Sequence, residues 1–174
     1  VYDKYQVVYF QSEEALRDFQ NDHSKTEGRL YSTTALFGST LPTADAPTPT
    51  RTGYTFKFWS REGQNGDVTG QTVNGWTNLY AVWEKNTYTV TYTDGVEGEA
   101  LFADQIYDNL LAGTPTPAFD GTPVRDGYVF AGWNPELAKT VSADATYTAV
   151  WKVDSNGNGQ PDDEEQRYSV TYTD

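Results

Sequence analysis

The sequence predicts an α+β fold in which two small mixed sheets, each with one short helix, follow one another in tandem. Three observations lead to this prediction. Sequence blocks occur twice in the same order, the blocks alternate apolar and polar residues as strands do, and a helix start lies between the first two blocks. A sheet with one helix packed across it is an economical way to bury the apolar face of such a unit.

The repeated blocks define the domain organisation. Three pairs of blocks match in order: YQVVYF (5–10) with YTVTYTD (88–94), RTGYTFKFW (51–59) with RDGYVFAGW (125–133), and LYAVWEK (79–85) with YTAVWK (147–152). The first copy is longer between its blocks, and length changes of this kind belong in loops. We therefore expect a first repeat over 1–85, a second over 86–152, a linker over 153–167, and the first strand of a third repeat over 168–174.

The blocks themselves have the pattern of strands. In the block at 88–94, Tyr88, Val90 and Tyr92 alternate with threonines, so one face is apolar and the other is polar. The blocks at 51–59 and 125–133 begin with a glycine turn signal and continue as a strand.

A helix is expected after the first strand of each repeat. Ser12 is the predicted N-cap of the first helix, with acidic residues in its first turn and Leu16 and Phe19 on one face. In the second repeat, residues 99–111 place apolar side chains at four-residue spacing and predict the corresponding helix. Proline-rich loops follow both segments.

The aromatic residues are expected to fill the small cores. Each repeat is short and contains no disulfide, so it needs large side chains to bury enough surface. The predicted core aromatics are Tyr54, Phe56, Trp59 and Trp83 in the first repeat, and Tyr128, Phe130, Trp133 and Trp151 in the second. A surface that stacks sugars is the alternative interpretation of these rings.

Composition excludes several functions. The 174 residues carry a net charge of −13, which disfavours nucleic acid and anionic membranes as partners. The absence of cysteine excludes disulfides, thiolate nucleophiles and cysteine-based zinc sites. No serine-hydrolase or phosphate-loop motif is present, and the single histidine, His23, lies in a polar stretch. We therefore expect no enzymatic activity.

The second repeat resembles a known family. The segment GYVFAGW (127–133), followed by YTAVW (147–151), is similar to the Listeria–Bacteroides repeat, also called the internalin B-type B-repeat. The resemblance covers nearly the whole chain, twice, and departs from the motif at Phe58, where a glycine is expected. It implies a β-grasp-like, ubiquitin-like fold and tandem arrays in large secreted or wall-anchored bacterial surface proteins, with no catalytic apparatus.

The segment DSNGNGQPDDEE at 154–165 fits the loop pattern of a calcium-binding EF-hand. Calcium takes six to eight oxygen ligands and accepts carboxylates, amides and backbone carbonyls together. The predicted ligands are Asp154, Asn156, Asn158, Gln160 (through its carbonyl), Asp162 and Glu165. The flanks are strands rather than helices, which resembles the helix-poor calcium loops of dockerins. The alternative is an acidic linker without metal, extended by its own charge.

These observations together predict a non-enzymatic, extracellular repeat segment of a bacterial cell-surface protein, acting as a stalk or an adhesive array. The expected partners are neighbouring repeats of the same chain, together with a host glycan or surface protein. With calcium bound, residues 153–167 would form a rigid connector, and without calcium a flexible hinge. The alternative function is a carbohydrate- or protein-binding module that uses exposed aromatics. Trp76 is the candidate contact residue, although a lid over the local core is the favoured interpretation of that side chain.

Overall fold

The computed structural model of the chain describes residues 3–64, 66–98 and 100–165. The chain divides between Asn86 and Thr87 into two compact units, here called unit 1 and unit 2. The predicted first strand of a third repeat, at 168–174, lies outside the described residues.

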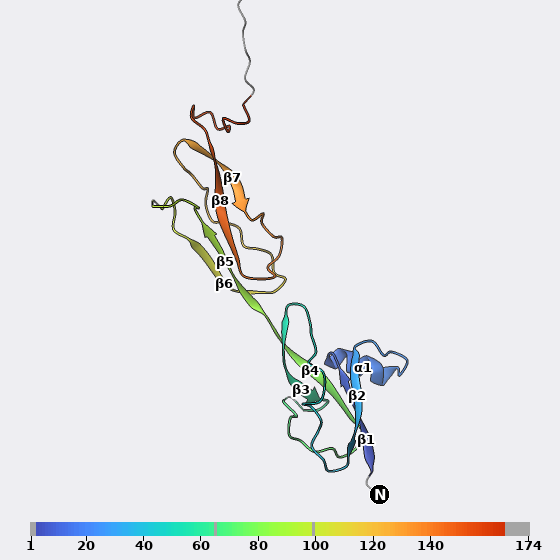
Figure 1. The fold of residues 1–174 in the computed structure, drawn as a ribbon. Helices are drawn as coiled ribbons and strands as arrows, with labels where there is room; N and C mark the ends of the chain where they lie inside the picture. The colour runs from blue at the N-terminus through green and yellow to red at the C-terminus, as the bar shows by residue number, and fades with distance from the viewer. Residues whose placement is uncertain (1–2, 65, 99, 166–174) are drawn as a thin grey trace, which may run out of the picture. The chain divides into compact units, whose positions relative to one another are not determined.

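Unit 1 is a four-stranded mixed sheet with one helix (Figure 1). Its elements are β1 (Lys4–Phe10), α1 (Glu13–Asn21), β2 (Arg29–Leu36), β3 (Tyr54–Arg61) and β4 (Thr77–Lys85). The strand order is β2-β1-β4-β3, with β1 and β4 parallel in the centre and antiparallel strands at both edges. The long segment between β1 and β4 is what a parallel pair requires, because its strands cannot be joined by a hairpin.

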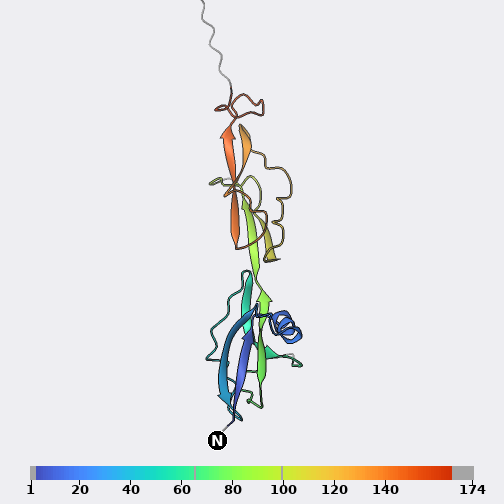
Figure 2. The same cartoon turned by 90° about the vertical axis from the view of Figure 1, so that its right-hand side faces the viewer.

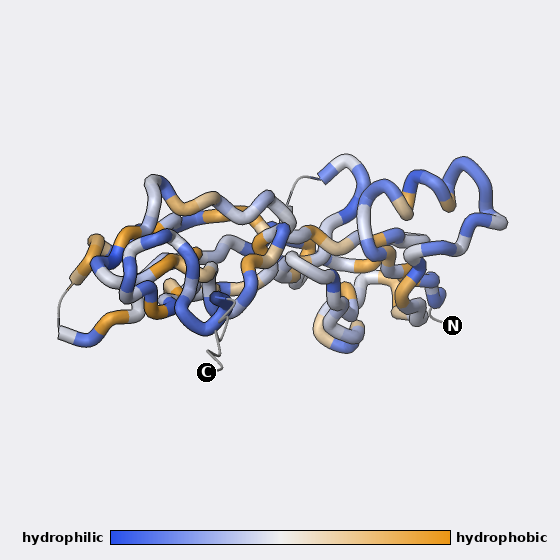
Figure 3. Tube along the Cα trace, turned by 90° about the horizontal axis from the view of Figure 1, so that it is seen from above, coloured by the Kyte–Doolittle hydropathy of each residue, from blue (hydrophilic) through white to orange (hydrophobic). Residues whose placement is uncertain are grey.

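Both faces of the unit 1 sheet are covered. On one face Val7, Tyr9 and Leu79 pack with Trp59 and with loop residues. On the other face, Val8, Phe10 and Tyr80 pack against Leu16 of α1. Figure 2 shows α1 beside the sheet, and in Figure 3 the helical segment near the N-terminus is mostly hydrophilic, as expected for a helix that buries one stripe.

Helix α1 begins as predicted. Ser12 is the N-cap, and its hydroxyl accepts a hydrogen bond from the backbone N–H of Ala15 at 3.1 Å. Leu16 is fully buried. The sequence analysis did not predict β2, which pairs with β1 along its whole length.

Unit 2 repeats the sheet, and its described residues, 87–98 and 100–165, contain no helix. Its strands are β5 (Thr87–Thr93), β6 (Gln105–Leu111), β7 (Tyr128–Asn134) and β8 (Ala145–Val153). The order β6-β5-β8-β7 and the parallel central pair match unit 1. Val90, Tyr92, Val141 and Tyr147 form the buried core.

The helix predicted over 99–111 is wrong, because residues 105–111 form the edge strand β6. In its pairing with β5, Tyr88 lies opposite Leu110 and Val90 opposite Tyr107, so two residues of β6 face one of β5. Asn109 has a φ of 58°, in the left-handed region that such a bulge uses. The bulge turns Tyr107 and Leu110 to the same side, whereas Ile106, one of the apolar residues at four-residue spacing, pairs with Thr91 and is 59% exposed.

The predicted aromatic cores are largely correct. Trp59 is 4% exposed, and Trp133 packs edge-on against Tyr92 with ring centroids 4.8 Å apart. Tyr128 and Tyr54 lie outside the core clusters. Tyr128 is 37% exposed and is covered by the guanidinium of Arg125, 3.8 Å from the ring centroid. Tyr54 has the equivalent contact with Arg51, at 4.0 Å. At both positions the positive φ of the preceding glycine forms the predicted turn.

Candidate functional sites

The loop at 154–165 is attached to the sheet of unit 2. The backbone N–H of Asp154 donates to the carbonyl of Gly127 at 2.9 Å, and that of Asp162 donates to the carbonyl of Val153 at 2.8 Å. Lys152 forms an ion pair with Glu164 and lies 3.5 Å from a carboxylate oxygen of Asp163. These contacts hold both ends of the loop against the end of β8.

Asp154 organises the first half of the loop. Its carboxylate is 7% exposed and accepts hydrogen bonds from the backbone N–H groups of Asn158, at 3.1 Å, and Gly159, at 2.9 Å. Gly159 has a φ of 82°, so the chain makes its sharp turn at the position where the loop pattern requires glycine.

Four of the six predicted calcium ligands converge. The side-chain amides of Asn156 and Asn158 both donate to the same oxygen of Glu165, at 2.8 and 2.6 Å, and the backbone of Asn158 is bonded to Asp154. The carboxylate of Asp162 is engaged by the backbone and hydroxyl of Ser155 instead. The backbone N–H of Gln160 donates to the side-chain oxygen of Asn158 at 2.8 Å.

The donor set is one that a calcium ion could use, because it consists of oxygen atoms from two carboxylates and two amides around one small loop. In the structure the two asparagines direct their N–H groups, rather than their side-chain oxygens, to Glu165. Among residues 3–64, 66–98 and 100–165, however, no three histidine, aspartate or glutamate side chains form a group that could hold a metal ion. The fit therefore depends on the asparagines as much as on the carboxylates.

Trp76 is not a lid over the core. Its side chain is 64% exposed, which contradicts the favoured interpretation of that residue. Its indole N–H donates to the side-chain oxygen of Asn78 at 3.3 Å. Around it lie polar residues that sequence reasoning did not identify, namely Gln20, Arg61, Glu62 and Asn78. No motif links these positions, because they come from three different elements.

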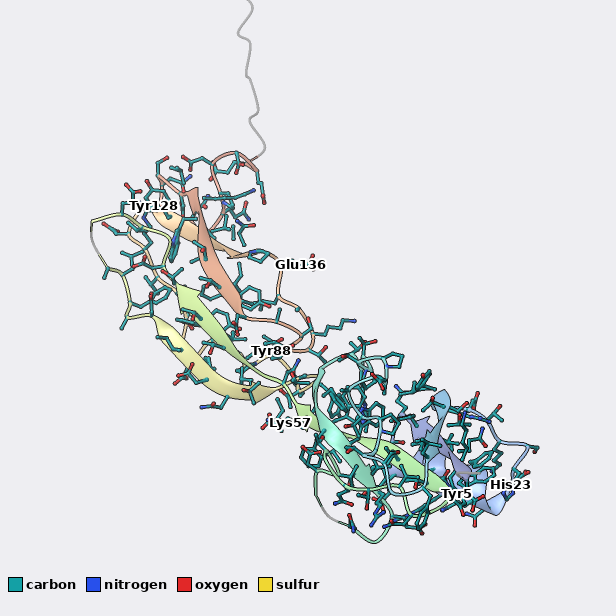
Figure 4. All side chains as sticks on the ribbon, turned by 60° about the horizontal axis from the view of Figure 1, so that its bottom comes forward. Tyr5, His23, Lys57, Tyr88, Tyr128 and Glu136 are labelled. Atoms are coloured by element: carbon teal, nitrogen blue, oxygen red, sulfur yellow. The ribbon has the colours of Figure 1, made fainter. Side chains whose placement is uncertain are left out.

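His23 lies just after α1 and is labelled in Figure 4. It is exposed, and its ring lies against Phe19, with centroids 5.0 Å apart. The lysines Lys57 and Lys152 are paired with surface carboxylates. No described helix is long and apolar enough to cross a membrane.

The geometry defines a class of protein: tandem copies of a small mixed-sheet unit, each with its own core. The sequence matches the family described as the Listeria-Bacteroides repeat domain over residues 19–82 and again over residues 88–156. The chain belongs to this family and contains two copies of its repeat.

Two curated proteins of Evansella cellulosilytica are similar to the chain. One, named "Putative Gly-rich membrane protein", is 29% identical over 131 residues, which cover 68% of this chain and 14% of that protein. The other, named "Putative membrane protein", is 27% identical over 149 residues, which cover 74% of this chain and 22% of that protein. The chain thus spans less than a quarter of each relative.

A solved structure titled "Streptococcal High Identity Repeats in Tandem (SHIRT) domains 3-4 from cell surface protein" is also similar. Its sequence identity is 19%, the match covers 86% of this chain and 98% of that one, and the TM-score is 0.24.

Proposed function

We propose that the chain is a non-enzymatic spacer or adhesive segment of an extracellular bacterial surface protein. The observation that carries this proposal is the tandem repetition of one self-contained unit, each copy with its own buried core. Units of this kind suit a stalk, because length can be changed by adding copies. The names of the two relatives as membrane proteins support a location at the cell envelope. A β-grasp-like classification is part of the proposal, supported by the parallel central strand pair.

The location can be tested with antibodies raised against the chain. Intact cells of the organism that carries the protein should be labelled, and mild protease treatment should remove the signal. Labelling that appears only after lysis would contradict an extracellular stalk.

The proposal includes a calcium-dependent joint at residues 154–165. The loop is already attached to unit 2 at both ends, and calcium would replace the amide contacts of Asn156 and Asn158 with Glu165 by metal–oxygen bonds. An isolated extracellular site of this type binds at about 10⁻⁴–10⁻³ M. That affinity suits the outside of a cell, where calcium is abundant.

Calorimetric titration of the chain with calcium tests the joint. We expect one site of about that affinity, weakened at least ten-fold, or roughly 1.4 kcal/mol, in Glu165→Gln. Asp163→Asn is the matched control, since it removes a neighbouring carboxylate that is not a predicted ligand. The site would be refuted if wild type, Glu165→Gln and Asp163→Asn bound calcium equally well, or if no heat of binding were measured for wild type.

A further inference from the structure

Trp76 is held rigidly at the surface of unit 1. Val73 before it is fully buried, and Thr77 after it is 7% exposed. The Thr77 hydroxyl donates to the carbonyl of Gly75 at 3.0 Å, which fixes the backbone on both sides of the indole. Trp76 is 64% exposed although Val73 and Thr77 beside it are buried, so its ring is available to a ligand at the surface.

The indole forms part of the wall of a cleft of about 380 Å³. The other lining residues come from the end of α1, the end of β3 and the start of β4: Gln20, Arg61, Glu62, Thr77 and Asn78. The amide of Gln20 donates to the carboxylate of Glu62 at 2.7 Å, which ties the helix to the residue that follows β3. The volume lies within the range of about 300–1,000 Å³ that is usual for small-ligand sites.

The lining chemistry indicates the class of ligand. Besides one aromatic ring, the cleft presents two amides, a guanidinium, a carboxylate and a hydroxyl, so donors and acceptors are both available and the two charges balance. The centre of a protein interface would be expected to surround the tryptophan with apolar side chains, whereas its neighbours in this cleft are polar. A polyanion is disfavoured by the net charge of −13.

We propose that this cleft binds a neutral saccharide, with the C–H face of one pyranose ring stacked on Trp76. The amide, guanidinium and carboxylate groups of Gln20, Arg61 and Glu62 would bind the hydroxyls around that ring. The segment with Trp76 is longer than the corresponding β7–β8 connection of unit 2, which contains no tryptophan. The proposed site therefore belongs to the first repeat, and its function goes beyond that of a spacer.

The test uses the whole chain and three neutral probes: cellotetraose, tetra-N-acetylchitotetraose and lactose. NMR spectra should show perturbation of the Trp76 indole N–H and the side-chain amides of Gln20 and Asn78 with at least one probe. Trp76→Ala should weaken that binding at least ten-fold, and Trp76→Tyr should weaken it less. Phe37→Ala is the matched control, because Phe37 is another exposed ring of unit 1, 57% exposed, outside the cleft.

Thermal unfolding of all three variants verifies that each is folded. Unchanged spectra with every probe at about 10 mM, a concentration well above the dissociation constant of even a weak site, would overturn the proposal. Equal loss of binding in Phe37→Ala would also overturn it. So would sedimentation that shows self-association dependent on Trp76, since the residue would then be a protein contact. Calcium titration is independent of these readouts, so the two proposals can fail separately.

Discussion

The hydroxyl of Tyr92 donates to the backbone carbonyl of Pro117 at 2.5 Å. In unit 1 Tyr9 donates in the same way to Pro42, at 2.7 Å. Both tyrosine side chains are fully buried in the centre of their sheets. Each unit thus ties its proline-rich loop to the core through one phenol, which explains why a loop without regular structure closes over the apolar face.

Tyr92→Phe should destabilise the chain by about 1–3 kcal/mol, because the carbonyl of Pro117 loses its donor near the core. Tyr9→Phe should have a similar effect through Pro42. Urea unfolding followed by tryptophan fluorescence measures both. The control is Tyr54→Phe, a half-buried position at the start of β3, where a change below about 0.5 kcal/mol is expected for a surface substitution. An equal loss in the free energy of unfolding at all three positions would show that the hydrogen bonds to Pro42 and Pro117 do not stabilise the chain.

At alkaline pH the same two residues should titrate last. Burial raises the pKa of Tyr9 and of Tyr92, and neighbouring tyrosines raise both further. Because the pKa is raised in the folded state, each neutral tyrosine contributes fully to the free energy of unfolding below the unfolded pKa of about 10. That contribution is lost as the pH rises through the folded pKa. Absorbance at alkaline pH should show most tyrosines ionising first and these two ionising together with unfolding. The control is the variant that carries both Tyr9→Phe and Tyr92→Phe. If wild type already shows more tyrosinate absorbance than this variant at about pH 10, before unfolding, the expectation is contradicted.

Asp94 should stabilise unit 2 except in acid. Its carboxylate is 6% exposed and accepts backbone hydrogen bonds from Val96 at 2.9 Å and Leu101 at 2.7 Å. The bond from Val96 is the main cause of a pKa below the ordinary 3.8. Because the pKa is lowered in the folded state, the ionised carboxylate contributes to the free energy of unfolding at pH values above its unfolded pKa. That contribution is lost as the pH falls through the folded pKa.

The expected result is that Asp94→Asn unfolds at lower urea concentration than wild type at pH 7, and that the two midpoints converge as the pH falls below about 4. The control is Asp126→Asn, an exposed carboxylate of the same unit. A constant difference between Asp94→Asn and wild type from pH 7 down to strong acid would refute a role for the charge.

Leu16→Ala should destabilise unit 1 alone. Leu16 is fully buried between α1 and the sheet face that carries Val8, Phe10 and Tyr80, and truncating such a side chain costs about 2–5 kcal/mol. Amide hydrogen exchange should become faster in β1 and β4 and stay unchanged in β5 and β8. Glu14→Ala, on the exposed side of the helix, provides the control. Faster exchange in both units would contradict separate cores.

Most of this architecture could be predicted from the sequence. The repeated blocks gave the two units, the alternation in YTVTYTD gave β5, and Ser12 with its apolar stripe gave α1. These signals are local, so they can be recognised without knowing what each segment packs against. The calcium loop is also a local pattern, and its predicted function stays a prediction.

The sequence also contains a reason why no helix is found in the part of unit 2 that the structure describes, although the apolar spacing in residues 99–111 concealed it. On the face where unit 1 has Val8, Phe10 and Tyr80, the matching positions of unit 2 are Thr91, Thr93 and Thr148. A threonine face offers a helix little apolar surface to bury, so the connection between β5 and β6 has no face of the sheet against which a helix would be stabilised.

Only the tertiary structure decided the rest. The bulge at Asn109 depends on pairing with β5, so no spacing rule applied to β6 alone could reveal it. Gln20 meets Arg61, Glu62 and Trp76 because the sheet brings α1, β3 and β4 together, although at least forty residues separate Gln20 from the other three. Local sequence determined α1 and strands such as β5. Long-range packing determined the edge strand β6 and which side chains became neighbours, because contact across a sheet depends on register and not on distance along the chain.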